Sequence, residues 1–430
     1  MSFRLSFLLL MAAGSVMAAA PPADDLAARA ARLHRDAIVV DTHQDVPEAL
    51  EEQWGAFANW PDIGQAGATK HVDIPRLRQG GVTAPFFVVY VPASYAESGG
   101  STRYALQMSD MVDGMVARHP AELMAAASVA DVRRAKGEGR IAVLKGIEGG
   151  HAIEDSMGVL RDFYRLGARY MTLTHTNTNH WADSAGNFFA PDYDPAASQV
   201  HHGLNDFGRA VVREMNRLGM MVDVSHVSTE TVDDVLETSR APVFASHSSC
   251  RALSGIPRNL TDDQIKRIAA KGGVVMINVS SAFLDQATVD HFKAAMARIR
   301  PEYVGIKQRY KDDPRRRREE LDKLLKTIPL RAPTAWTKVV DHIDHVIALA
   351  GPDAVGLGTD YDGIPDPPEG LEDVSKLPRI TEELLRRGRS EEDVRKVLGE
   401  SFLRFFSKVE EVSRSLSAEP PSLAEVPPAS

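Results

Sequence analysis

The stretch IVVDTHQD at residues 38–45 decides the fold, because it ends an apolar, β-branched run on two side chains that bind metals. Residues two apart in an extended segment point to the same side, so His43 and Asp45 can bind one ion together. Three later apolar runs end in the same way. Their final ligands are Glu148, His226 and His247. Nitrogen and carboxylate ligands at strand ends are typical of hydrolytic metal centres, and these five suffice for two divalent ions that share one carboxylate.

The spacing of such runs predicts the architecture. Eight β-branched segments are bounded by Gly, Pro or polar clusters. They cover residues 38–41, 82–91, 141–148, 170–175, 220–226, 243–247, 273–279 and 354–360. Helical patterns, such as 158–166 and 207–218, lie between most of them. Strand and helix therefore alternate as in an α/β fold of the (β/α)8 TIM-like barrel type, where polar residues at the carboxyl ends of the strands meet at one face. This is the arrangement of a metallo-dependent hydrolase.

By composition the chain divides into three consecutive parts, and the second contains an insertion. Residues 1–20 form an expected signal peptide, and residues 21–414 form a single catalytic domain. A charged helical insertion is expected at about 283–333 within that domain, and a flexible polar and Pro-rich tail at 415–430. The hydrophobic share of 43% is sufficient for a full core. A formal net charge of -9, without a basic stripe, argues against nucleic acid as a partner.

Residues 1–20 have the order of a secretory leader. Arg4 supplies the basic start, residues 5–16 an apolar stretch too short to span a bilayer comfortably, and residues 18–20 a small-residue cleavage site. We expect cleavage near Ala20, no membrane anchor in the mature chain, and a bacterial periplasm as the destination. Cys250 is the only cysteine, so no disulfide can form within the chain.

Beyond these patterns, the chain from about Ala37 to Val409 resembles the membrane dipeptidase (renal dipeptidase) family of zinc peptidases, family M19. The segments that carry the resemblance are DTHQD at Asp41, HVDIPRLRQGGV at His71, GIEGGH at Gly146, TLTH at Thr172, VDVSH at Val222, ASHSS at Ala245, RN at Arg258, and GLGTDYDG with PEGLEDVSK between Gly356 and Lys376. The family implies a barrel with two zinc ions that hydrolyses dipeptides whose C-terminal residue has L or D configuration.

The resemblance also assigns roles to the metal ligands. One zinc ion would be held by His43 and Asp45, and the other by His226 and His247. Glu148 would bridge the two ions and so take part in catalysis. Two zinc ions lower the pKa of a shared water from about 16 toward 7, which supplies a hydroxide nucleophile at neutral pH.

Three further residues match substrate-contacting positions of the family. His175 would contact the scissile carbonyl and donate to the developing oxyanion. Arg258 would bind the terminal carboxylate of the dipeptide, and a bidentate pair there would fix the length of the substrate. Asp360 would lie beside the metal-bound water and pass its proton to the leaving amine. Phe283 is a departure, because the family often has a polar aromatic residue near that position.

The resulting hypothesis is a binuclear zinc dipeptidase that acts on dipeptides with a free C-terminal carboxylate. Two alternatives stay open. One is another barrel metallohydrolase, of amidase or lactonase type, although such enzymes usually carry His-x-His on the first strand. The other is a non-enzymatic periplasmic zinc-binding protein, which would need neither Asp360 nor Arg258. A homodimer is compatible with the sequence.

Overall fold

The computed structural model describes residues 23–54, 60–327 and 333–426, and these carry all that follows. The expected signal peptide at 1–20 lies outside the described residues. Among the described helices, none combines the length and the apolar character that crossing a bilayer requires.

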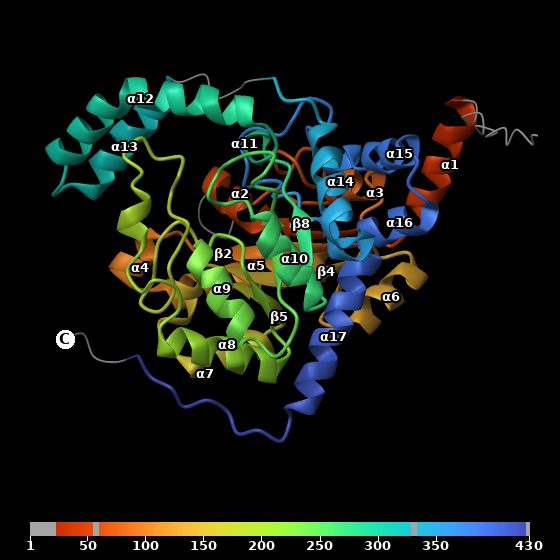
Figure 1. Ribbon diagram of the computed structural model, residues 1–430, viewed down its shortest axis with the longest axis horizontal. Coiled ribbons are helices and arrows are strands. Elements are labelled where there is room, and N and C mark those ends of the chain that lie inside the picture. The colour runs from red at the N-terminus through yellow and green to blue at the C-terminus, as the bar shows by residue number, and fades with distance from the viewer. Residues whose placement is uncertain (1–22, 55–59, 328–332, 427–430) are drawn as a thin grey trace, which may run out of the picture.

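A closed barrel of parallel strands forms the centre of the molecule (Figure 1). The strands are β1 (Val40–Gln44), β2 (Ala84–Tyr90), β3 (Leu123–Ala125), β4 (Ile141–Glu148), β5 (Ala168–Thr172), β6 (Met221–Asp223), β7 (Phe244–Ser248), β8 (Val274–Ile277) and β9 (Val355–Leu357). Their hydrogen-bonded order is β2-β1-β9-β8-β7-β6-β5-β4, and β4 also pairs with β2, which closes the ring. The predicted (β/α)8 barrel is confirmed.

One strand was missed by the sequence patterns. β3 pairs with the first three residues of β4 and lies outside the ring. With the sequence LMA it is too short to show a period of two, so it gives no strand signal. The other eight strands overlap the eight predicted runs, and the strand of Glu148 has the bounds that the sequence predicts.

Helices surround the barrel. They are α1 (Ala23–Asp36), α2 (Val46–Trp54), α3 (Ile74–Gln79), α4 (Ser94–Ser98), α5 (Ser101–Arg118), α6 (Val129–Glu138), α7 (Met157–Arg165), α8 (Asp206–Leu218), α9 (Thr229–Thr238), α10 (Asp262–Ala270), α11 (Ser281–Leu284), α12 (Gln286–Arg309), α13 (Pro314–Leu325), α14 (Lys338–Ala350), α15 (Pro378–Arg386), α16 (Glu391–Arg395) and α17 (Ser401–Ser415). Local signals set their ends. α8, for example, is capped by the residues on either side of it. The side chain of Asn205 accepts a hydrogen bond from the Gly208 amide at its start, and Gly219, where φ is 86°, follows its end.

Aromatic side chains fill the interior of the barrel. The ring of Tyr170 on β5 lies 5.2 Å from that of Phe86 on β2 and 5.5 Å from that of Phe244 on β7. Because these three strands are not neighbours in the ring, the contacts cross the inside of the barrel. Phe402 and Phe405 of α17 pack against this layer. The interior is therefore a packed core, and it supports the residues at the carboxyl ends of the strands.

The charged segment expected at 283–333 contains α12 and α13, which pack together at one edge of the molecule (Figure 1). It follows β8, so it belongs to the loops at the carboxyl face of the barrel. After α17, at the other end of the chain, Ser422 donates its amide to Glu214 of α8 and accepts from Arg161 of α7. Flexibility of the tail at 415–430 stays a prediction.

Gly146 on β4 offers a test of this packing. A Cβ atom there would lie 2.0 Å from the ring of Tyr170, so Gly146→Ala must displace a buried ring that contacts both sides of the barrel interior. We expect the free energy of unfolding to fall by about 1–3 kcal/mol, as measured by urea denaturation. Gly137→Ala on α6 is the matched control, because no atom lies within 4 Å of the added Cβ. Equal stabilities for the two variants would contradict this packing.

Candidate metal centre

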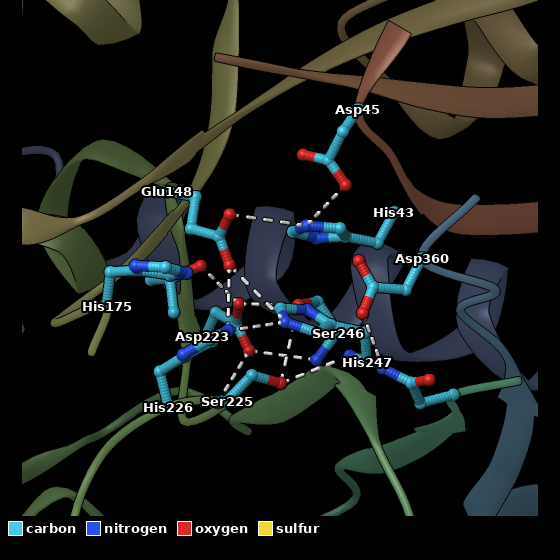
Figure 2. A network of polar contacts seen from close by, with 12 residues as sticks. His43, Asp45, Glu148, His175, Asp223, Ser225, His226, Ser246, His247 and Asp360 are labelled. Carbon is cyan, nitrogen blue, oxygen red and sulfur yellow. Dashed lines mark hydrogen bonds and ion pairs between the residues drawn. The ribbon is translucent and has the colours of Figure 1, made fainter. Parts of the chain in front are cut away.

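Five ligand side chains converge at the carboxyl ends of four strands (Figure 2). His43 and His247 come from β1 and β7, Glu148 ends β4, and Asp45 and His226 follow β1 and β6. The carboxylate of Glu148 lies between the histidines. Its Oε1 is 3.0 Å from Nε2 of His226 and 3.3 Å from Nε2 of His247, while its Oε2 is 3.5 Å from Nε2 of His43. Nε2 of His43 is also 3.5 Å from Oδ2 of Asp45. The structure thus brings together all five predicted ligands.

Several buried nitrogen and oxygen atoms of this cluster lie close together without hydrogen-bond partners among the described residues. Nε2 of His226 and Nε2 of His247 approach to 2.9 Å, and both face the same carboxylate oxygen. Both carboxylate oxygens of Asp45 and Nε2 of His43 are buried without a hydrogen-bond partner among the described residues. Buried polar atoms are otherwise almost always paired. Converging lone pairs of this kind fit divalent cations, with Glu148 in the position of a bridging ligand.

Neighbouring hydroxyl groups fix the orientation of two histidine rings. Nδ1 of His43 is 2.9 Å from the hydroxyl of Tyr170, and Nδ1 of His247 is 2.7 Å from the hydroxyl of Ser246. Ser246 in turn donates to Oδ2 of Asp223 at 2.6 Å. Hydrogen bonds at Nδ1 leave Nε2 free for a metal, which is how outer contacts usually set the tautomer of a ligand. Sequence patterns did not identify the roles of Tyr170, Ser246 or Asp223; the contacts of Tyr170 with His43 and of Ser246 with Asp223 join different strands.

Several carboxylates are buried close together in the cluster, and their pKa values respond to burial and to the neighbouring charged groups. Burial raises the pKa of Asp360 well above its usual range, and the nearby Asp45 and Glu148 add to this against the opposing effect of His43. Burial would also raise the pKa of Glu148, but His43 and His226 hold it well below its usual range. A cation would relieve the repulsion among these carboxylates.

The three predicted substrate-contacting residues lie around the same cavity, which has a volume of about 390 Å³. Asp360 accepts a hydrogen bond from Asn278 at 2.7 Å. The ring of His175 lies 4.3 Å from that of His226, and burial lowers its pKa to about 4, so the ring is neutral at pH 7. His175, His226 and Glu148 also have ligand atoms within 4.8 Å of one another, so geometry alone would allow His175 to bind a metal.

Arg258 is the unusual member of the cavity lining. It is 4% exposed, and its guanidinium donates to the Ser248 hydroxyl at 3.3 Å and to the His247 carbonyl at 3.4 Å. Its Nε has no hydrogen-bond partner, and it forms no ion pair within the described part of the chain. Burial lowers the pKa of Arg258 to about 10, so the side chain keeps its charge at neutral pH.

Two residues of the site occupy strained backbone conformations. His226 and Asp360 have φ values of 68° and 65°, in the left-handed region that residues other than glycine rarely adopt. Each such residue costs about 1 kcal/mol or more, and the surrounding structure must hold it in place. Such strain is common where a side chain must be aimed at a ligand.

Some cavity residues escaped the sequence analysis. Glu48 and Tyr90 also line the cavity, and the ring of Tyr90 lies 4.6 Å from that of His175. Glu48 follows Asp45 by three residues at the start of α2, so the spacing of one helical turn was an available signal. The cavity lining also contains a group of apolar side chains, called the apolar wall below. It consists of Phe188, Phe189, Phe283, Phe292 and Met296.

Comparison with known proteins agrees with the fold and shows the family. The sequence model of the membrane dipeptidase family (peptidase family M19) matches residues 27–420. Three solved structures are similar over most of their length. The probable dipeptidase PvdM from Pseudomonas aeruginosa is 24% identical, with a TM-score of 0.76, and the match covers 91% of this chain and 100% of that one. The dipeptidase AC, a metallo peptidase, is 27% identical over 87% and 99% of the two chains, with a TM-score of 0.68. A metallo peptidase from Rhodobacter sphaeroides, solved with a phosphinate mimic of the dipeptide L-Ala-D-Ala, is 26% identical over 87% and 99%, with a TM-score of 0.67.

The central position of Glu148 predicts how metal content responds to its loss. Elemental analysis of the purified protein should find close to two divalent ions per chain. Glu148→Gln should reduce the content to one or fewer, because a neutral amide has a single acceptor oxygen and cannot bridge two cations. Glu138→Gln, on the exposed end of α6, should keep the wild-type content. One tightly bound ion in a fully active wild type would contradict the paired site.

Proposed function

This chain belongs to the membrane dipeptidase family of metallopeptidases, and we propose that it is a binuclear zinc enzyme that hydrolyses dipeptides with a free C-terminal carboxylate. His43 and Asp45 would hold one ion, His226 and His247 the other, and Glu148 both. When bound, the metal ions would supply Lewis acidity, which polarises a carbonyl and lowers the pKa of a water molecule.

The observation that carries the carboxylate specificity is the buried and unpaired guanidinium of Arg258. A buried arginine normally has an anionic partner, because an uncompensated charge in a low-dielectric site is costly. Within the described residues Arg258 has none, although it lines the same cavity as the metal ligands. A substrate carboxylate would complete it with charge-assisted hydrogen bonds. The Rhodobacter sphaeroides peptidase, solved with a dipeptide mimic, supports this class of ligand.

The remaining residues have separate tasks. The neutral ring of His175 can donate one N–H to the carbonyl oxygen of the scissile bond as negative charge develops there. Asp360, held by Asn278, can accept a proton from the attacking water and return it to the leaving amine. A zinc-storage protein would need neither Arg258 nor a proton carrier, so these two residues favour an enzyme.

Arg258→Ala should separate a dipeptidase from a general amidase. The loss of a charge-assisted pair in a closed site costs about 3 kcal/mol, so kcat/KM for a free dipeptide should fall roughly a hundredfold. The C-terminal amide of the same dipeptide has no carboxylate to lose, and its already poor kcat/KM should change little. Equal losses on both substrates would remove the assignment of Arg258 to the carboxylate.

Asp360→Asn is the matched comparison for that experiment. Asparagine keeps the shape of the side chain and cannot carry the proton, so kcat should fall on the dipeptide and on its amide alike. Steady-state kinetics of both variants on both substrates distinguish loss of binding from loss of proton transfer. An Asp360→Asn enzyme with wild-type kcat would exclude Asp360 as the proton carrier.

We also propose that the enzyme is exported to a bacterial periplasm. The basic start, apolar stretch and small-residue site of the leader support this. Intact-mass analysis of protein from the periplasmic fraction should give a chain that begins at Pro21. A mass that includes residues 1–20, or that of a lipid adduct, would argue against cleavage at Ala20.

A further inference from the structure

The apolar wall is made by three segments that are distant in the sequence. Phe188 and Phe189 follow β5 by a long loop, Phe283 lies on α11, and Phe292 and Met296 lie on α12. Their rings form a continuous series. Phe283 is 6.1 Å from Phe188, Phe188 is 3.9 Å from Phe189, and Phe189 is 5.1 Å from Phe292. Helix α12 thus extends the lining of the cavity beyond the strand ends of the barrel.

The series of rings begins at Arg258. The guanidinium carbon of Arg258 lies 5.3 Å from the centre of the Phe283 ring. A carboxylate held by Arg258 is therefore next to the apolar wall, and the side chain of the residue that carries it starts only two bonds away. The cavity lining also includes polar and acidic side chains, among them Asp45, Glu48 and Tyr90, and none of these is part of the series of rings. Apolar contacts are thus concentrated at the end of the cavity where the C-terminal residue of a dipeptide would lie.

We propose that the apolar wall is a subsite for the side chain of the C-terminal residue and gives this enzyme a preference for a large apolar or aromatic residue there. The proposal rests on the proposed dipeptidase function and on the role of Arg258. Apolar side chains that line a cavity gain free energy when a ligand replaces the water beside them. Phe188, Phe189 and Phe292 are only partly buried, so their faces are available for such contact.

The wild-type enzyme gives the first test, with three substrates that differ in one side chain. Relative to L-Ala-L-Ala, kcat/KM should be about tenfold higher or more for L-Ala-L-Phe, because each added methylene in an apolar pocket contributes up to that order. L-Phe-L-Ala carries the same ring on the other residue and should show no such gain. A preference for L-Phe-L-Ala, or no preference, would overturn the subsite.

Substitutions on α12 test whether the apolar wall causes the preference for L-Ala-L-Phe over L-Ala-L-Ala. Phe292→Ala and Met296→Ala should each lower the ratio of kcat/KM for L-Ala-L-Phe to that for L-Ala-L-Ala by about fivefold to tenfold, mainly through KM. Phe292→Leu, which keeps part of the apolar surface, should lower it less. Val304→Ala is the control on the same helix, since Val304 is 45% exposed and does not line the cavity, and it should leave the ratio unchanged.

The outcomes separate this inference from the proposed function. A metal-loaded wild type that cleaves none of the three dipeptides would contradict the dipeptidase proposal itself. A different outcome is that the enzyme cleaves all three dipeptides, but Phe292→Ala and Met296→Ala leave the ratio of kcat/KM for L-Ala-L-Phe to that for L-Ala-L-Ala unchanged. The dipeptidase proposal would then stand, and the apolar wall would not be its specificity determinant. Thermal unfolding of each variant checks that the helix is folded, and the wild-type ratio tests the proposal even where a variant does not fold.

Discussion

The carboxylate of Glu148 faces the Nε2 atoms of three histidines, and the rest of the structure depends on holding that arrangement. The ligands come from β1, β4 and β7 and from the turn after β6, which only a closed barrel brings to one place. Without a cation the cluster is costly, because buried lone pairs lack partners and several carboxylates repel one another. The packed interior of the barrel must therefore supply the folding free energy that offsets the cost of burying this cluster.

Tyr170 links that core to the site. Its ring packs between Phe86 and Phe244 inside the barrel, while its hydroxyl contacts Nδ1 of His43 at 2.9 Å. Gly146 leaves the space that the ring requires. Tyr170 therefore packs in the apolar interior and also fixes the orientation of His43. A change in packing beneath the site would shift this histidine ring.

Sequence patterns predict the barrel, and they predict five side chains that the structure brings together, because both depend on local signals. Apolar, β-branched runs identify eight strands, and the residue that ends each run is necessarily placed at the carboxyl face. The missed strand, β3, has no such signal in three residues. The hydrogen bonds that Ser246 donates to Asp223 and that Asn278 donates to Asp360 join neighbouring strands of the barrel whose residues are far apart in the sequence, so no spacing in the sequence indicates them. The apolar wall combines three segments and could be found only after folding.

The cavity lining contains both signs of charge, as a zwitterionic ligand would require. Arg258 provides buried positive charge beside the apolar wall, whereas Glu48, Asp45 and Asp360 provide carboxylates elsewhere in the lining. A free dipeptide carries an ammonium group at one end and a carboxylate at the other, and both must be neutralised when they leave water. A longer peptide would move one of these charges away from its counterpart and place an uncharged amide beside Arg258. Under the proposed function, length selection would follow from the cost of leaving the guanidinium unpaired, and α12 with the loop of Phe188 and Phe189 would determine which side chains fit beside it.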